Sequence, residues 1–296
     1  MKLSYLLLDV FTTTPLSGNP LAVVEKGDGL LDNQMQAIAK EFGLSETVFL
    51  TRPSQDRHTA GVRIFTPAIE LPFAGHPTVG AAAVLGLQHR LSAVRIEERV
   101  GLITCVVDKL DSRTAHARFA LPQLPEVAGK PPERGALALA LGLDSEEIGC
   151  GSYQPAVYSA GVLFYLIPVR NTQALRRIKL NPGGWDELFP LGNSAIYCFT
   201  TVDDEPDTDL AARMFAPGMG LGEDPGTGSA AAALIGLLAR HAEFDEGQAE
   251  FRLRQGFEMG RPCRIALQLR KSGNVLTHAS IGGHAVIVGQ GALDLD

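Results

Sequence analysis

Two glycine-rich segments of this 296-residue chain place polar side chains at the start of long apolar runs. The first is Gly75-His76-Pro77-Thr78 and the second is Gly226-Thr227-Gly228-Ser229, and the runs meet no charged residue until Arg90 and Arg240. A helix that is apolar on every side is buried, and the N–H groups of a helix N-terminus attract anions. The pattern therefore predicts two buried helices whose polar, Gly-rich N-termini are the natural place for a site.

Glu46 is a carboxylate at the junction of two expected elements. Apolar residues at helical spacing end at Gly43, and β-branched and aromatic residues predict a strand over Thr47-Val48-Phe49-Leu50, so Glu46 lies at a helix-to-strand junction. Apolar neighbours would partly desolvate its carboxylate and raise its pKa towards the operating pH, as a general acid/base requires. The other interpretation is a solvated carboxylate in a turn, which is where glutamates usually lie.

The remaining candidates are polar residues near the two helix starts and in one turn. Asp224 and Ser229 are residue types that cap helices, and they can cap and contact a ligand at once. His76, taken alone, is more often structural than functional. Asn19, in the segment Ser17-Gly18-Asn19-Pro20, serves a turn first and a ligand second. The other histidines lack metal-ligand spacing, so we expect no metal site.

Composition excludes several classes of function. The chain has 33 acidic and 26 basic residues, a net charge of −7, and no basic stripe, so nucleic acid is not an expected partner. No apolar run approaches the ~20 residues of a membrane span, and the N-terminal leucines meet Asp9 too early for a signal peptide. Four widely spaced cysteines without a C-x-x-C pair argue against a zinc site or disulfides and favour a reducing cytoplasm.

An internal repeat indicates a duplicated domain. Arg63-Ile64-Phe65-Thr66-Pro67 recurs as Arg213-Met214-Phe215-Ala216-Pro217, an offset of 213 − 63 = 150. The segment 45–51 recurs as 194–200, and Gly75 recurs as Gly226, with offsets of 149 and 151. Three blocks in one order predict two halves, each with many short strands and one central buried helix. The halves differ at Glu46 and His76, which face Ala195 and Thr227, as in a site made asymmetric for chemistry.

Local signals predict several element boundaries. Asp32 is a plausible N-cap of the helix that ends near Gly43, and an amphipathic helix is expected over Thr172 to Leu180. The Pro- and Gly-rich segment from Pro122 to Arg134 is a candidate linker, and the chain is expected to end in two strands, around Ser280 and Val286.

Six motifs together resemble the PhzF-like family, the phenazine-biosynthesis isomerases within the diaminopimelate epimerase and proline racemase superfamily. They follow the family order over residues 17–262 and are Ser17-Gly18-Asn19-Pro20, Gly43-Leu44-Ser45-Glu46-Thr47-Val48-Phe49, Arg63-x-Phe65-Thr66-Pro67, Glu70-Leu71-Pro72-Phe73-Ala74-Gly75-His76-Pro77, Glu223-Asp224-x-x-Thr227-Gly228-Ser229-Ala230 and Gln255-Gly256-Phe257-Glu258-Met259-Gly260-Arg261-Pro262.

The resemblance implies an α+β fold of two pseudo-symmetric domains, each a barrel-like, mostly antiparallel sheet around a central buried helix. We expect residues 1–122 to form the first domain, completed by a C-terminal strand over 283–296, and residues 123–282 to form the second. The resemblance places the active site in the cleft between the domains, without cofactor or metal. It also implies a homodimer, on which the sequence itself is silent.

The resemblance further implies a cofactor-independent isomerase acting on a small carboxylate-bearing metabolite. Glu46 matches the family's general acid/base; the residues implied to bind substrate are His76, Asp224, Ser229, Gly75, Gly228, Thr227 and Asn19. The superfamily's paired catalytic cysteines are replaced by Ala74 and Pro225, so proton transfer falls to a carboxylate. Isomerisation and epimerisation both remain open.

Two other functions stay open at this point. Gly226-x-Gly228-x-x-Ala231 superficially fits a dinucleotide fingerprint, but it follows Glu223-Asp224-Pro225 where that motif requires an apolar strand. A non-catalytic binding protein on the same scaffold is the second alternative, although such a protein has no need of Glu46. The segment 158–164 departs from the pattern of the phenazine enzymes, so the resemblance does not fix the substrate.

Overall fold

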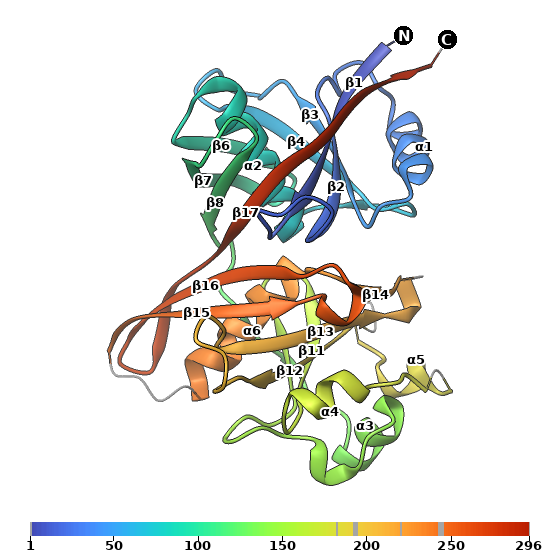
Figure 1. Ribbon diagram of the computed structural model, residues 1–296, viewed down its shortest axis with the longest axis vertical. Coiled ribbons are helices and arrows are strands. Elements are labelled where there is room, and N and C mark those ends of the chain that lie inside the picture. The colour runs from blue at the N-terminus through green and yellow to red at the C-terminus, as the bar shows by residue number, and fades with distance from the viewer. Residues whose placement is uncertain (1, 182, 192–194, 220, 242–245, 296) are drawn as a thin grey trace. The chain divides into compact units, whose positions relative to one another are not determined.

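A computed structural model describes residues 2–181, 183–191, 195–219, 221–241 and 246–295. The chain forms two compact units. Unit 1 contains Met1–Pro122 together with Ile281–Asp296, and unit 2 contains Gln123–Ser280. In Figure 1 each unit consists of a curved sheet and a central helix, labelled α2 in unit 1 and α6 in unit 2.

Unit 1 is built from eight long strands and one short strand. These are β1 (Lys2–Val10), β2 (Asn19–Val24), β3 (Thr47–Thr51), β4 (Ala60–Phe65), β5 (Glu70–Leu71), β6 (Ala93–Glu98), β7 (Gly101–Lys109), β8 (Thr114–Ala120) and the C-terminal part of β17 (Val275–Asp294). The order β1, β2, β3, β4, β6, β7, β8, β17 returns to β1, so the eight long strands close a barrel. The β2–β3 and β4–β6 pairs are parallel, whereas β1–β2, β3–β4, β6–β7, β7–β8 and β1–β17 are antiparallel.

Helix α2 (Gly75–His89) fills this barrel and contacts β1, β2, β3, β6, β7 and β8. Its residues from Gly75 to Gly86 are all buried. Small residues make the fit possible, because a Cβ atom on Gly80 would lie 2.4 Å from Leu21 Cδ2. The run of Gly, Ala and Val in the sequence therefore allows a helix to pack inside the barrel.

Helix α1 (Asp32–Phe42) connects β2 to β3 and packs on the outside of the sheet through Met35, Ile38 and Ala39. Its N-cap is Leu31, so the prediction of Asp32 at this position was wrong. The Leu31 N–H donates to Gln34 Oε1 at 2.8 Å, while Asp32, the first helical residue, accepts from Arg63 Nη1 at 2.7 Å. The Gln34 side chain thus satisfies the N–H group of the N-cap residue.

Unit 2 repeats this arrangement of strands. They are β9 (Glu126–Gly129), β10 (Ala156–Ser159), β11 (Leu163–Pro168), β12 (Ile196–Thr201), β13 (Leu210–Ala216), β14 (Leu221–Asp224), β15 (Gly247–Gln255), β16 (Cys263–Ser272) and the start of β17. The β11–β12 and β13–β15 pairs are parallel, as β2–β3 and β4–β6 are in unit 1. Helix α6 (Gly228–His241) is buried from Ala230 to Ala239 and packs against β9, β10, β11 and β16.

Short helices cover the outer face of the unit 2 sheet. They are α3 (Arg134–Leu141), α4 (Thr172–Arg177) and α5 (Trp185–Leu188), with single 3₁₀ turns η1 (Ser145–Glu147), η2 (Pro217–Met219) and η3 (Phe257–Met259). Leu141, Leu175 and Trp185 from these helices join Ile167 and Phe215 from the strands in one apolar core. Each unit therefore has one helix inside its sheet and others outside it, which confirms the predicted α+β fold.

The internal repeat is present in the strand register and in the side chains. Phe49 pairs with Arg63 across β3 and β4, and Cys198 pairs with Arg213 across β12 and β13, which reproduces the offsets of 149 and 150. Each arginine donates two hydrogen bonds to one glutamate: Arg63 to Glu70 at 2.7 and 2.8 Å, and Arg213 to Glu223 at 2.8 Å for both. Ser194, the first residue of the repeated block 194–200, lies outside the described residues.

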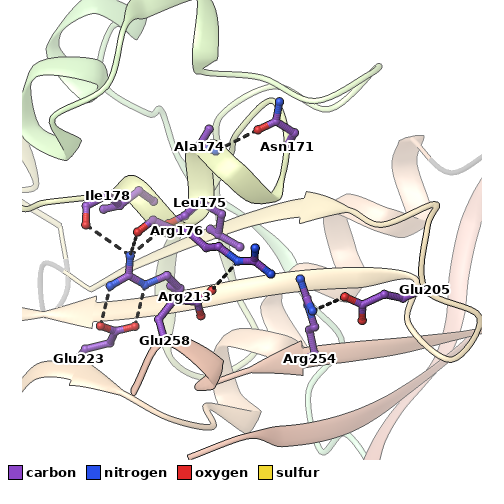
Figure 2. A network of polar contacts seen from close by, with 10 residues as sticks. All are labelled: Asn171, Ala174, Leu175, Arg176, Ile178, Glu205, Arg213, Glu223, Arg254 and Glu258. Carbon is purple, nitrogen blue, oxygen red and sulfur yellow. Dashed lines mark hydrogen bonds and ion pairs between the residues drawn. The ribbon is translucent and has the colours of Figure 1, made fainter. Parts of the chain in front are cut away.

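Three predicted boundaries differ from the structure. The candidate linker from Pro122 to Arg134 contains β9, which pairs with β10, and the two expected C-terminal strands are one continuous strand, β17. The helix expected to reach Leu180 ends at Arg177. Beyond this point the carbonyl groups at the helix end, those of Leu175, Arg176 and Ile178, accept hydrogen bonds from the Arg213 guanidinium. Figure 2 shows this arginine between Glu223 and the end of α4. Long-range pairing overrides local composition in all three cases.

Candidate functional site

Glu46, His76 and Asn19 come together in unit 1. Glu46 follows α1, which ends at Gly43 in the left-handed conformation (φ 63°), and immediately precedes β3. His76 lies in the first turn of α2, and its Nε2 is 3.5 Å from Oε2 of Glu46. The Glu46 side chain is 15% exposed and that of His76 is 4% exposed, so the pair is largely shielded from water while the carboxylate keeps some access.

Asn19 determines which nitrogen of His76 faces Glu46. The Asn19 side-chain amide lies with Nδ2 3.3 Å from Nδ1 of His76, and both residues are buried. An amide N–H that donates to Nδ1 makes this nitrogen the acceptor of a neutral imidazole and leaves the proton on Nε2. The Nε2–H group then points towards the Glu46 carboxylate, 3.5 Å away.

Gly75 is the first residue of α2, next to this pair. The N-cap residue is Ala74, whose side chain has no acceptor for the backbone N–H groups of the first turn. The Thr78 N–H donates to the Ala74 carbonyl at 3.2 Å. The positive end of the helix dipole favours an anion beside this turn.

A second polar cluster in unit 2 contains Asp224, Thr227 and Gln255. Asp224 ends β14, and its carboxylate accepts a short hydrogen bond from the Thr227 hydroxyl. Gln255 Nε2 donates to the Asp224 carbonyl at 2.8 Å and to Thr227 Oγ1 at 3.0 Å, and Oε1 accepts from the Thr227 N–H at 3.1 Å. The Tyr197 hydroxyl also donates to Gln255 Oε1, at 2.9 Å. The segment before α6 is thus held by one buried side chain.

Gly228 and Ser229 are the first two residues of α6. Gly228 is buried and Ser229 is half-buried, so Ser229 is the more accessible of the two. The eight residues singled out in the sequence therefore form two groups, one in each unit: Glu46, His76, Asn19 and Gly75 in unit 1, and Asp224, Thr227, Gly228 and Ser229 in unit 2.

The sequence did not single out Gln255 as a site residue, although it drew attention to the turn that Gln255 begins. Gln255 is 1% exposed, and Gly256 after it has φ 78° and lies so close to Pro225 that a Cβ atom would be 2.5 Å from the Pro225 carbonyl oxygen. The signal in the sequence is a Gln-Gly pair between two strands, because only glycine combines this backbone conformation with such a close approach.

The described part of the chain has no group of three or more His, Cys, Asp or Glu side chains arranged to hold a metal ion. Within the described residues, no helix has both the length and the apolar character needed to cross a membrane.

The comparisons with known proteins agree with this fold. Residues 8–291 match the family described as phenazine biosynthesis-like protein. An uncharacterized isomerase of Mesorhizobium japonicum is 45% identical, with 98% of each chain covered. A trans-2,3-dihydro-3-hydroxyanthranilate isomerase of Pseudomonas aeruginosa is 33% identical, covering 97% of this chain and 98% of the relative. The crystal structure of a PhzF-family protein of Bacillus anthracis superposes with a TM-score of 0.89 and 25% identity over 100% of both chains.

The fold and the relatives define an isomerase of two repeated barrel-and-helix units. The chain belongs to the phenazine biosynthesis-like family, as its motifs predicted.

Proposed function

We propose that this isomerase moves a proton between carbons of a small carboxylate-bearing metabolite, without a cofactor, and that Glu46 is its general acid/base. The observation that carries the proposal is the contact of 3.5 Å between Glu46 and the Nε2 of a histidine whose other nitrogen faces Asn19. This contact defines a carboxylate that is shielded, oriented and ready to accept a proton.

The proposed reaction has two proton transfers. Ionised Glu46 removes a proton from a carbon beside a carbonyl or an unsaturated bond, and the electron pair moves into the adjacent π system. The protonated Glu46 then returns the proton at another carbon. One proton leaves and one returns, so the substrate is neither oxidised nor reduced. His76 orients the carboxylate through its Nε2–H in both steps.

The helix starts would hold the charges that this reaction needs. The positive end of the α2 dipole would stabilise the substrate carboxylate or the charge that develops on the π system. We propose that Asp224, Thr227 and Ser229 of unit 2 also bind substrate. Gln255 supports this by holding Asp224 and Thr227 in one arrangement.

The substrate is a carboxylate of the same general kind as that of the related isomerases. Two of these relatives are trans-2,3-dihydro-3-hydroxyanthranilate isomerases at 33% and 32% identity, so this compound is the first probe to use. A homodimer and a cytoplasmic location also remain proposals; the first is tested by light scattering of the purified protein.

Glu46→Gln is the decisive variant. The protein is incubated in deuterated water with trans-2,3-dihydro-3-hydroxyanthranilate and with a panel of small carboxylates, and incorporated deuterium is measured by mass spectrometry. Glu46→Gln should abolish incorporation for every compound that the unaltered protein labels, because the amide cannot carry the proton. Glu41→Gln, an exposed glutamate on α1, is the matched control and should keep full activity. Incorporation that survives Glu46→Gln would exclude Glu46 as the acid/base.

A further inference from the structure

Glu98 is a carboxyl group inside the unit 1 barrel that the proposed reaction does not use. It ends β6, in which Val94, Ile96 and Glu98 are buried in alternation and Arg95 is exposed. The side chain therefore points inward, to a position where the strand otherwise carries valine and isoleucine. Glu98 is 8% exposed, and its Oε2 has no hydrogen-bond partner among the described residues.

The hydrogen bonds of Thr78 indicate which form of Glu98 fits this position. Thr78 Oγ1 lies 2.7 Å from the Ala74 carbonyl oxygen and 2.7 Å from Glu98 Oε1. A hydroxyl group has one hydrogen, and the Ala74 carbonyl can only accept. If Thr78 donates to Ala74, the second contact needs a hydrogen on Glu98. A protonated Glu98 satisfies both contacts, whereas an ionised Glu98 takes the Thr78 hydrogen and leaves two acceptor oxygens, those of Thr78 and Ala74, facing each other.

We propose that Glu98 is a neutral carboxylic acid in the working enzyme, and that it is the positioning residue that holds the first turn of α2, and with it His76, against Glu46. The positioning role rests on the proposed function of Glu46 and His76. The protonation of Glu98 does not, since it follows from the contacts inside the barrel.

Electrostatics around Glu98 support the neutral form. Burial raises the pKa of Glu98 to about 8, against a smaller opposing effect of the hydrogen bond from Thr78. The Cys105 thiol on β7 is also buried, and burial raises its pKa, so it adds no charge beside Glu98. Arg63, Glu70 and Arg99 line the same cavity as Glu98, but both arginines bind Glu70.

The start of α2 couples Glu98 to the catalytic pair. Ala74 accepts from the Thr78 N–H at 3.2 Å as well as from its hydroxyl, and His76 lies between these two residues in the same turn. The helix dipole favours a negative charge at this end, so it opposes the effect of burial. Ionisation of Glu98 would move the Thr78 hydrogen away from Ala74 and loosen the turn that sets the distance from His76 to Glu46.

Nuclear magnetic resonance tests both parts of the proposal without a substrate. The side-chain carboxyl carbon of Glu98 is followed from pH 5 to 10 in protein labelled with ¹³C-glutamate and assigned by its loss in Glu98→Gln. The ring nitrogens of His76 are followed in protein labelled with ¹⁵N-histidine and assigned with His76→Gln. We expect Glu98 to titrate near pH 8, and the His76 nitrogens to shift with the same midpoint.

The variants Glu98→Gln and Glu97→Gln test whether the His76 shift depends on the Glu98 carboxyl group in particular or on any change in this strand. Glu98→Gln keeps a donor towards Thr78 but cannot ionise, so the His76 shift near pH 8 should disappear. Glu97→Gln, one residue earlier on β6, should leave it unchanged, because the Glu97 carboxylate binds Ser54 and His58 instead. If Glu98→Gln fails to fold, Thr78→Val replaces it. This change removes the hydroxyl that links Glu98 to Ala74, so the His76 shift near pH 8 should again disappear.

The outcomes are distinct. A Glu98 carboxyl that titrates near 4.5 overturns the neutral acid, and a His76 shift that persists in Glu98→Gln overturns the positioning role. Deuterium incorporation that survives Glu46→Gln would instead remove the proposed function while leaving the protonation of Glu98 intact.

Discussion

Nε2 of His76 lies 3.5 Å from Oε2 of Glu46, although strands β3, β4 and β5 lie between these two residues in the chain. The same ring meets Asn19, from the start of β2, through its other nitrogen. The starts of β2, β3 and α2 thus meet at the His76 ring. The contact of Nδ1 with Asn19 decides whether Nε2 carries the hydrogen that faces Glu46.

Asn19→Leu should lower the rate of deuterium incorporation by about 10- to 100-fold, or about 1.4–2.7 kcal/mol, which is within the cost of leaving a buried acceptor without its hydrogen bond. Leucine has a similar size but no N–H for Nδ1 of His76, so the ring no longer prefers to present Nε2–H to Glu46. The initial rate of incorporation is the measurement.

Asn171→Leu is the matched control for that change. Asn171 caps α4, where its side chain accepts from the Ala174 N–H at 2.9 Å, so the substitution should reduce stability by about 1 kcal/mol and leave the rate unchanged. Equal rate losses in the two variants would show that Asn19 acts through stability and not through His76.

Gln255→Glu should destabilise the protein by about 1–3 kcal/mol, because the carboxylate keeps the two accepted hydrogen bonds but loses the two that Gln255 donates to Asp224 and Thr227. The measurement is the midpoint of urea unfolding. Gln248→Glu, at the exposed start of the same strand, should change the free energy of unfolding by less than about 0.5 kcal/mol. If the two variants are equally stable, Gln255 does not hold the segment before α6.

The two equivalent arginines should differ in their effect on stability. Arg213 donates to three carbonyl groups at the end of α4 as well as to Glu223, and its side chain is 10% exposed, whereas that of Arg63 is 27% exposed. Arg213→Met should cost about 3–5 kcal/mol, because it leaves the half-buried Glu223 carboxylate and three carbonyl groups at the end of α4 without their donor. Arg63→Met should cost about 1 kcal/mol. Urea unfolding of both variants checks the order, and a larger loss for Arg63→Met would contradict it.

Glu98→Gln should change how stability depends on pH. The pKa of Glu98 is raised from 4.5 to about 8, so between these values the folded protein keeps a proton that the unfolded chain has released. The free energy of unfolding of the unaltered protein should therefore fall as the pH rises through this window, by about 1.4 kcal/mol per pH unit from this group, and level off above pH 8.

Glutamine at position 98 does not titrate, so the stability of the variant relative to the unaltered protein should rise between pH 5 and 8. Urea unfolding at each pH measures the difference, in which the contributions of all other groups cancel. A difference that stays constant over this range would show that Glu98 has an ordinary pKa in the folded protein.

The sequence was sufficient to predict the features that depend on local pattern or on repetition. Uncharged runs of Gly and Ala predicted the two buried helices, and the recurrence of Arg63-x-Phe65 as Arg213-x-Phe215 predicted the duplication, which the paired registers reproduce. The motif around Glu46 and His76 predicted that these residues belong to one site, and the structure places them in contact within unit 1.

The contacts that complete the two clusters were not predictable in the same way. Nδ1 of His76 meets Asn19, 57 residues earlier, and Gln255 meets Thr227, 28 residues earlier, because strand pairing brings these positions together. Glu98 was missed for a related reason. Buried and more exposed residues alternate along β6, and Glu98 differs from its neighbour Glu97 only in that its side chain points inward. Sequence spacing alone carries no information about these neighbours.

Strand β17 contributes its first residues to unit 2 and its last to unit 1, and Ile281–Asp296 complete the barrel that begins with β1. During synthesis, all of unit 2 therefore leaves the ribosome before unit 1 has the strand that closes it. The segment that carries Glu46 and His76 is made first and can reach its final form only last. Until then β1 and β8 are unpaired along the edges that β17 will occupy, which makes the late arrival of the C-terminal segment the step that protects the nascent chain from edge-to-edge association.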